Sequence, residues 1–199
     1  MRVCFFGDSF VNGYGDPEYQ GWVGRLCRSA RAQGYDLTAY NWGIRRASSD
    51  DIKASWLAEA SARLPREHRG AVVFSFGAND RVMDRGEMRV PMSRSLDNTR
   101  TILATAAPRW PTLFISSPRP IAGDPEGVAA AQVRGIAAIC DGQNVPLFDA
   151  FAESANFTHW RAEATAGDGA HPGARGYEEL AVLLAAWPAW RALLDALKG

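Results

Sequence analysis

Ala71-Val72-Val73-Phe74-Ser75-Phe76 is an apolar run in which neither face of an extended chain would be polar. A strand with one face in water would alternate apolar and polar residues, whereas a continuous apolar run is typical of a strand covered on both sides. The run is followed directly by Gly77-Ala78-Asn79-Asp80, which contains turn-forming residues. We therefore predict a buried strand of a parallel sheet that ends in a polar turn.

Shorter apolar runs and helical patterns alternate on either side of this strand. Residues 21–32 place their apolar side chains on one helical face, and Ser49-Asp50 predicts the N-cap of a helix that continues to about Leu64. We expect strands at residues 2–6, 36–40, 71–76, 112–116 and 145–148, and further helices at residues 93–107, 125–141 and 173–186, with another turn or two after Pro188. This alternation predicts βαβ units in one three-layer α/β/α domain over residues 1–199, with a five-stranded, mostly parallel sheet. The irregular stretches 81–92 and 118–124 follow strands, so we expect both at the carboxyl edge of the sheet, where open α/β folds bind ligands.

The composition is that of an ordinary globular domain. The chain has 199 residues, of which 47% are hydrophobic and 22% are charged, and its formal net charge is zero. The charge balance gives no indication of a nucleic-acid or anionic-membrane partner. No apolar stretch approaches the roughly 20 residues that a membrane span needs. We therefore expect no nucleic-acid partner and no membrane span.

The N-terminus and the cysteines favour a cytoplasmic location. The apolar run at residues 2–6 is too short for the core of a signal peptide, and Asp8 interrupts it. Cys4, Cys27 and Cys140 are odd in number and lack metal-ligand spacing, so we expect buried free thiols in a reducing compartment and no metal. Seven tryptophans are many for this length, and some could lie in the interface of a homo-oligomer.

Ser9 is the candidate nucleophile. Gly7-Asp8-Ser9-Phe10 follows the first predicted strand, and a serine at such a turn can present both its hydroxyl and its backbone N–H. Gly7 allows the backbone to turn tightly. The pattern is not G-x-S-x-G, so the nucleophile elbow of α/β-hydrolases is not indicated. Gly-Asp-Ser is also a common turn, and this simpler interpretation stays open.

His171 is the candidate base among three histidines. His68 lies in a charged stretch and His159 beside a tryptophan, so surface or packing roles are expected for both. His171 lies in a glycine-rich turn before the predicted closing helix, and Pro172 restricts its backbone to extended conformations. Such a turn would hold an imidazole in place without burying it.

Asp168 precedes His171 by three residues and is its candidate partner. A loop of this length can bring the carboxylate to the imidazole Nδ1–H, which would fix the tautomer and stabilise the imidazolium. Asp168 could instead form an Asx-turn or cap the closing helix. Asp149, at the end of the fifth predicted strand, is a competing acid.

Asn79 follows the buried strand, where its amide could face a developing oxyanion or form a turn. We expect Asp8 and Asp80 to bind loop amides rather than to take part in chemistry. Taken in order, these blocks resemble the SGNH hydrolases, also called GDSL esterases and lipases. Residues 7–10 are similar to the first block, residues 77–80 to the G-x-N-D block and residues 168–172 to the closing D-x-x-H-P block. The resemblance implies a flavodoxin-like fold, with Ser9 as nucleophile, His171 as base, Asp168 as its support, and the Ser9 N–H and Asn79 as oxyanion donors.

The remaining block departs from the pattern of that family. Its usual sequence N-x-G-x-x-G places a last glycine where Asn41-Trp42-Gly43-Ile44-Arg45-Arg46 has Arg46. Either Arg46 supplies its backbone N–H to the oxyanion hole, or Gly43 does. A side chain at position 46 requires a backbone conformation open to residues other than glycine. It would also narrow the site or attract an anionic substrate.

We therefore predict a serine hydrolase that cleaves small or short-chain carboxylic esters through an acyl-enzyme, without a cofactor or metal. Alternatives are a carbohydrate O-acetyl esterase, a thioesterase or a lysophospholipase of the same superfamily. From another class, the chain could be a catalytically weak, hydrolase-like binding protein. The residues that could line its pocket are Arg45, Arg119, Trp42, Trp160 and residues 83–92.

Overall fold

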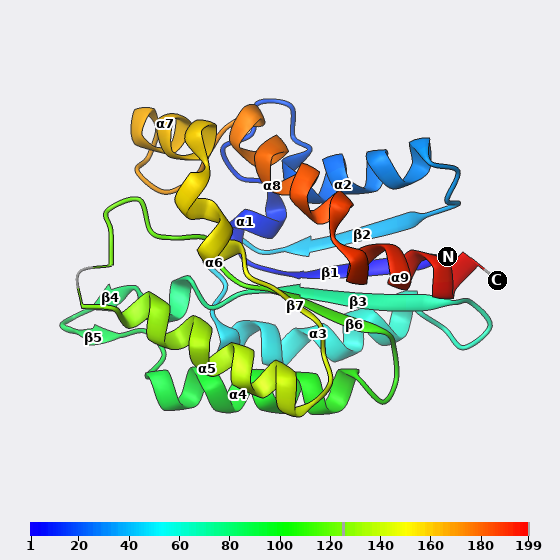
Figure 1. Cartoon of the computed structure of the whole chain (residues 1–199). Helices are drawn as coiled ribbons and strands as arrows, with labels where there is room; N and C mark the ends of the chain where they lie inside the picture. Colours follow the sequence, from blue (N-terminus) through cyan, green and yellow to red (C-terminus); the bar gives the residue numbers. More distant parts are fainter. Residues whose placement is uncertain (125, 199) are drawn as a thin grey trace.

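Five parallel strands form one sheet in the order β2-β1-β3-β6-β7 (Figure 1). The computed structural model describes residues 1–124 and 126–198. The strands are β1 (Arg2–Gly7), β2 (Thr38–Gly43), β3 (Gly70–Ser75), β6 (Thr112–Ile115) and β7 (Leu147–Phe148). The predicted five-stranded α/β fold is thereby confirmed, and the outer strand β2 extends three residues beyond the predicted end.

Helices cover both faces of this sheet, which gives the three layers seen in Figure 1. One face carries α2 (Gly21–Ala32), α8 (Ala174–Ala186) and α9 (Pro188–Lys198), and the other carries α3 (Ser49–Arg63), α4 (Met92–Ala106) and α5 (Val128–Gly142). Within the described residues no single helix is long and apolar enough to cross a membrane. By length and composition α8 and α9 would qualify only as a pair, and the pair is bent by 64°.

Alternate residues of the strands pack into two separate hydrophobic clusters. Phe5 and Val73 face the cluster under α2, α8 and α9, whereas Phe6 and Phe74 face the cluster under α3, α4 and α5. This arrangement explains why residues 71–76 have no polar face. The three cysteines are buried and free, as predicted. The seven tryptophans are all buried or half-buried within this one chain.

Several short elements were not predicted. They are α1 (Ser9–Asn12), the 3-10 turns η1 (Asn79–Arg81) and η2 (Ser154–Asn156), the hairpin β4 (Met83–Asp84) with β5 (Glu87–Met88), α6 (Ala150–Glu153) and α7 (Thr158–Ala166). The helix α9 has 11 residues, which exceeds the turn or two expected after Pro188. The short segments carry few periodic apolar positions, and tertiary packing determines them, whereas α9 buries Trp190, Leu193, Leu194 and Leu197 at helical spacing.

The start of α5 lies later than predicted. Gly127 has a φ of 68°, in the left-handed region, so the helix cannot extend back through it. The carboxylate of Asp124 accepts hydrogen bonds from the N–H groups of Ala129 (3.0 Å) and Ala130 (2.9 Å), which satisfies two donors of the first turn. The predicted first residue, Pro125, lies outside the described residues.

Candidate active site

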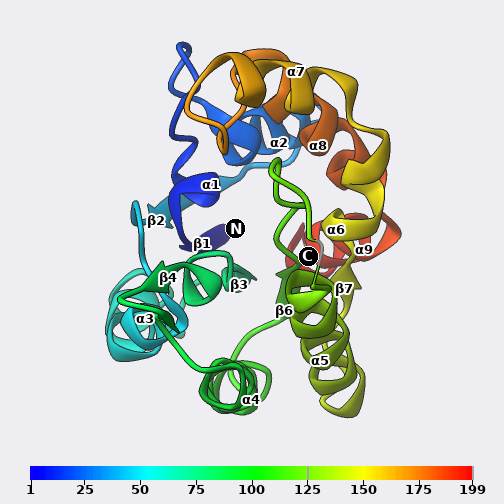
Figure 2. The ribbon, with the colours of Figure 1, turned by 90° about the vertical axis from the view of Figure 1, so that its left-hand side faces the viewer.

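The predicted site residues meet at the carboxyl edge of the sheet, which Figure 2 shows face on. Ser9 follows β1, Arg46 follows β2 and Asn79 follows β3. A cavity of about 470 Å³ opens between them, and the segments 81–89 and 118–122 border it, as expected for an open α/β sheet. Another cavity, of about 540 Å³, lies beside α7 and α8 and contains His159 but no candidate nucleophile. The cavity at Ser9 is therefore the candidate active site.

Ser9 begins the short helix α1 and is 5% exposed. Asp8 caps this helix, since its Oδ1 accepts the N–H of Phe10 (3.0 Å). A Cβ on Gly7 would lie 2.0 Å from the carbonyl oxygen of Ser75 in the neighbouring strand β3. The turn into α1 therefore requires glycine at this position. The Ser9 N–H is at the first position of a helix, where no intrahelical acceptor exists, and it is therefore available to a ligand.

His171 connects Ser9 to Asp168 through both of its ring nitrogens. Nε2 lies 2.7 Å from Ser9 Oγ, and Nδ1 lies 2.7 Å from Asp168 Oδ2. An ionised carboxylate can only accept, so Nδ1 carries the proton and Nε2 accepts the hydrogen bond of the Ser9 hydroxyl. In this tautomer the imidazole can remove the proton of Ser9.

Asp168 combines the two roles that the sequence left as alternatives. Its Oδ2 contacts the imidazole, while its Oδ1 accepts the N–H groups of Ala170 (3.0 Å) and His171 (2.9 Å) in an Asx-turn. Partial burial would raise the pKa of Asp168, but the hydrogen bonds from His171 and Ala170 outweigh it and lower that pKa to about 2. The Asp168 carboxylate is therefore ionised at neutral pH and can stabilise a positive charge on the imidazole.

The other acidic residues at this edge, Asp149, Asp80 and Asp8, each accept a hydrogen bond from a backbone N–H group. Asp149 caps α6, accepting the N–H of Ala152 (2.9 Å), and does not line the cavity at Ser9. Asp80 accepts the N–H of Ser49 (2.7 Å), as predicted for a loop-binding acid. Asp8 Oδ2 is buried without a hydrogen-bond partner in the described part of the chain. Burial raises the pKa of Asp8 to about 7, although the Phe10 N–H opposes this shift.

Asn79 lines the cavity as predicted, and its side chain is fixed by one of its two amide hydrogens. Nδ2 donates to the carbonyl oxygen of Ala47 (3.1 Å), which leaves the second N–H for a ligand. Gly43 behaves differently, because its N–H donates to Asn41 Oδ1 (2.9 Å) and the residue does not border the cavity. A Cβ on Gly43 would lie 2.0 Å from the backbone nitrogen of Asn12, so glycine serves close packing there.

Arg46 lines the cavity with a φ of 68°. This is the left-handed region, which favours glycine but is also open to other residues, as a side chain at this position requires. A single residue can adopt it at a cost of roughly 1–2 kcal/mol. Arg89 Nη1 donates to the Arg46 carbonyl oxygen (2.9 Å), which helps to hold this conformation.

Tyr14 was not predicted as a site residue, yet it contacts two of the groups there. Its ring meets the His171 ring edge-on at 4.9 Å, and the guanidinium of Arg45 lies 3.8 Å above its centre. Phe10 packs on His171 at 5.0 Å. Tyr14 lies in no motif of the chain, so no sequence signal could have found it.

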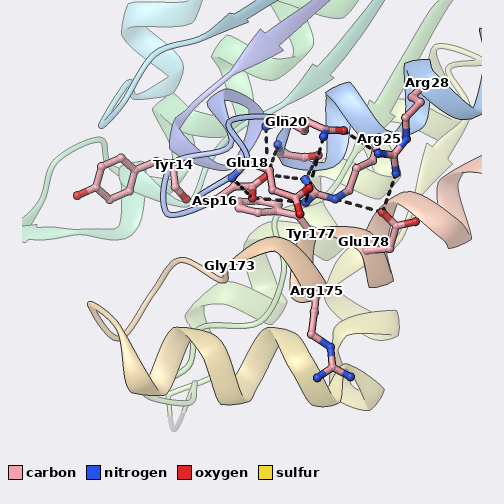
Figure 3. A network of polar contacts seen from close by, with 12 residues as sticks. Tyr14, Asp16, Glu18, Gln20, Arg25, Arg28, Gly173, Arg175, Tyr177 and Glu178 are labelled. Carbon is pink, nitrogen blue, oxygen red and sulfur yellow. Dashed lines mark hydrogen bonds and ion pairs between the residues drawn. The ribbon is translucent and has the colours of Figure 1, made fainter.

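A buried ion pair fixes the loop that carries Tyr14 (Figure 3). Asp16 pairs with Arg25 of α2 and accepts the N–H of Gly21 (2.7 Å), and Arg25 also reaches Glu178 of α8 (3.1 Å). Burial would raise the pKa of Asp16, but the Arg25 hydrogen bond outweighs it and lowers that pKa. Tyr177 donates to the Tyr14 carbonyl oxygen (2.7 Å), so hydrogen bonds hold the loop at Tyr14 as well as at Asp16.

The predicted pocket residues divide into two groups. Arg45 and Arg119 line the cavity at Ser9, and so does Arg89 from the stretch 83–92. Trp42 instead packs under the guanidinium of Arg63 (4.2 Å), and Trp160 is buried in the core. Neither tryptophan borders the cavity.

A three-layer α/β/α fold, with a serine hydroxyl in the cavity that contacts an imidazole backed by a carboxylate, is typical of a hydrolase. The model of the GDSL-like lipase/acylhydrolase family matches residues 5–179. The chain belongs to this family, as its motifs predict, and is thus a carboxylic ester hydrolase.

Solved structures share the fold over almost the whole chain. A lipase/acylhydrolase from Enterococcus faecalis has a TM-score of 0.74 at 23% identity, covering 99% of this chain and 97% of that one. An acetylxylan esterase from Geobacillus stearothermophilus has a TM-score of 0.74 at 21% identity, covering 97% and 93%. A G-D-S-L lipolytic protein from Veillonella parvula has 0.70 at 19%, covering 92% and 96%. Among curated proteins, no sequence relative was found.

Proposed function

We propose that the protein cleaves small or short-chain carboxylic esters through an acyl-enzyme on Ser9. The observation that carries this proposal is the position of the His171 imidazole, 2.7 Å from Ser9 Oγ on one side and 2.7 Å from Asp168 Oδ2 on the other. Geometry of this kind is what general-base activation of a serine requires. Two structures of the acetylxylan esterase of similar fold are described as catalytic mutants, one changed at a histidine and one at a serine. These descriptions agree with a serine nucleophile and a histidine base in this chain.

The first half of the reaction forms the acyl-enzyme. Nε2 of His171 takes the Ser9 proton as Oγ attacks the ester carbonyl carbon, and the Asp168 carboxylate stabilises the resulting imidazolium. The tetrahedral intermediate then expels the alcohol, which leaves with the proton from Nε2. The second half repeats these steps with water, so that the acid is released and Ser9 regains its proton.

Three donors face the developing oxyanion in this proposal. They are the Ser9 N–H at the start of α1, the free amide hydrogen of Asn79 and the backbone N–H of Arg46. Arg46 is favoured over Gly43 because the Gly43 N–H is already bound to Asn41. The left-handed backbone of Arg46 supports the view that its N–H is the oxyanion donor, as the N–H of a glycine would be, and that its side chain is not.

The substrate is proposed to be small. The cavity has a volume of about 470 Å³, and its apolar wall consists of short or compact side chains such as Val82, Ile121 and Ala122. The fold of an acetylxylan esterase is similar. Acetylated xylooligosaccharides are therefore a second candidate substrate.

The experiment compares hydrolysis of para-nitrophenyl acetate, butyrate and octanoate by the wild type and by Ser9→Ala. We expect the acetate and butyrate to be cleaved faster than the octanoate, and Ser9→Ala to lose nearly all activity. Ser55→Ala is a matched control, because Ser55 lies in α3 and does not line the cavity at Ser9. Equal rates from wild type and Ser9→Ala would contradict the proposed nucleophile and favour a binding protein.

A further inference from the structure

Among the residues that the structure describes, five arginines and no acidic residue line the cavity that contains Ser9. They are Arg45, Arg46, Arg81, Arg89 and Arg119. The chain as a whole carries no formal net charge, so the excess of positive charge is local to this cavity. A concentration of one sign of charge in a concave site raises the local concentration of ligands of the opposite sign.

These arginines also lack carboxylate partners. Within residues 1–124 and 126–198, none of the five forms an ion pair, whereas arginines elsewhere do, among them Arg25, Arg63, Arg94 and Arg100. Burial lowers the pKa of Arg81, and the charges of Asp124, Asp8 and Asp80 oppose this shift. These carboxylates partly balance the charge of Arg81, whereas the other four arginines have no such partners among the described residues.

Three of these four make contacts that fix their position without neutralising them. Arg45 stacks on Tyr14 at 3.8 Å, and Arg89 donates to a carbonyl oxygen at 2.9 Å. Arg119 stacks on Phe151 at 4.3 Å and donates from Nε to the Phe151 carbonyl oxygen (3.0 Å). A guanidinium has five N–H donors, so each retains donors for a carboxylate or phosphate. Holding the side chains in advance reduces the entropy lost when a ligand binds.

The rest of the cavity wall is apolar and includes Phe10, Val82 and Ile121. We infer that the substrate of this site is a small ester that carries a carboxylate or phosphate group, which the arginines hold close to the scissile bond. The ester part of this inference rests on the proposed function, whereas the anion part rests on the arginines. A planar guanidinium can donate two parallel hydrogen bonds to the oxygens of a carboxylate or phosphate group, so arginine is well suited to hold such an anion.

The test compares kcat/KM for the neutral ester phenyl acetate with that for three anionic esters, each divided by its rate of alkaline hydrolysis. Para-acetoxybenzoate has the carboxylate in the alcohol part, monophenyl succinate has it in the acyl part, and para-acetoxyphenyl phosphate carries the phosphate. We expect at least one anionic ester to be preferred by about tenfold or more. High salt should reduce this preference. A corrected ratio near one for all three anionic esters would overturn the inference.

Variants assign the preference to the arginines. In the double variant Arg45→Gln/Arg119→Gln, the ratio of anionic to neutral kcat/KM should fall by about tenfold or more. Arg100→Gln is the matched control, because Arg100 is an exposed arginine of α4 paired with Asp97, and it should leave the ratio unchanged. An unchanged ratio in the double variant would overturn the inference.

Binding without turnover separates this inference from the proposed function. In Ser9→Ala, calorimetry should show phenyl phosphate or benzoate binding more tightly than phenol, and the two arginine changes should weaken that binding by about tenfold or more. If no ester is hydrolysed but the anion binds, the proposed function fails and the anion site stands. If neither anion binds, the inference is overturned whatever the hydrolysis rates.

Discussion

Arg89 donates a hydrogen bond from Nη1 to the carbonyl oxygen of Arg46 at 2.9 Å, and Arg46 is the residue that has a φ of 68° where the related sequence block has glycine. The hydrogen bond from Arg89 thus helps to hold Arg46 in a backbone conformation that glycine adopts without strain.

Arg46→Gly tests whether the backbone is the functional part. Relief of the left-handed conformation is worth roughly 1–2 kcal/mol, and the greater backbone entropy of glycine offsets roughly 0.5–1 kcal/mol of it. We expect a slightly higher free energy of unfolding in urea and a kcat on phenyl acetate within a few-fold of wild type. A loss of about a hundredfold or more in kcat would show that the side chain acts on the oxyanion.

Asn79→Ala should lower kcat by roughly 10²–10³, which corresponds to roughly 2.7–4 kcal/mol of transition-state stabilisation from one oxyanion donor. The variant also loses the hydrogen bond to the Ala47 carbonyl oxygen, for which a cost of about 1 kcal/mol in stability is expected. Steady-state kinetics and thermal unfolding measure the two effects separately. A kcat that falls only in proportion to the folded fraction would refute the catalytic role of this amide.

Asp168→Asn should reduce kcat by about 10⁴, because an amide donating to the imidazole would favour the wrong tautomer. The Asx-turn should survive, since the asparagine Oδ1 can still accept the N–H groups of Ala170 and His171. Circular dichroism and the unfolding midpoint serve as controls for the fold. Retention of most of the activity would indicate that another acid supports His171.

Asp8→Asn should make stability less dependent on pH. The folded-state pKa of Asp8 is raised to about 7 by burial, so its contribution is fully present below the unfolded pKa of about 4 and is lost as the pH rises through 7. The variant should therefore be more stable than wild type at pH 8, and this difference should shrink toward pH 4. Oδ1 of the asparagine can still accept the Phe10 N–H. Urea unfolding at the two pH values measures this, and parallel curves at both would contradict the assigned pKa.

Asp16→Asn should destabilise the protein and slow the reaction. The variant removes the buried partner of Arg25 and leaves the guanidinium with the more exposed carboxylates of Glu18 and Glu178, so the cost should lie below the roughly 3–5 kcal/mol typical of a buried charge left without a partner. The loop that holds Tyr14 against His171 would then loosen, so kcat should fall even where the protein remains folded. Glu178→Gln, which changes a half-exposed partner of Arg25, is the milder control. A stability loss without any change in kcat would show that the loop does not position the imidazole.

The apolar run at residues 71–76 made the fold predictable, because a strand between two layers has to be apolar on both faces. Ser9, Asp168 and His171 were predictable for a different reason, since each occurs in a short block whose residues lie at fixed spacing. Their contact is a product of topology, which brings the end of β1 and the loop before α8 to the same edge.

Other parts of the site could not be read from the chain. Tyr14 and the pair Asp16–Arg25 form no motif, and their roles depend on tertiary contacts between α2, α8 and the loop before α2. The left-handed conformation of Arg46 could not be predicted, because few residues other than glycine adopt it and residue type alone gives no indication of it. The cytoplasmic location and a homo-oligomeric state stay predictions.

If His171 activates Ser9, then Ser9 is the residue that forms the covalent intermediate. Treatment with a fluorophosphonate, followed by intact-mass and peptide analysis, identifies the residue that reacts. We expect one adduct, located on Ser9, which is absent in Ser9→Ala and strongly reduced in His171→Ala. An adduct on another residue, or equal labelling of wild type and Ser9→Ala, would show that Ser9 is not the nucleophile.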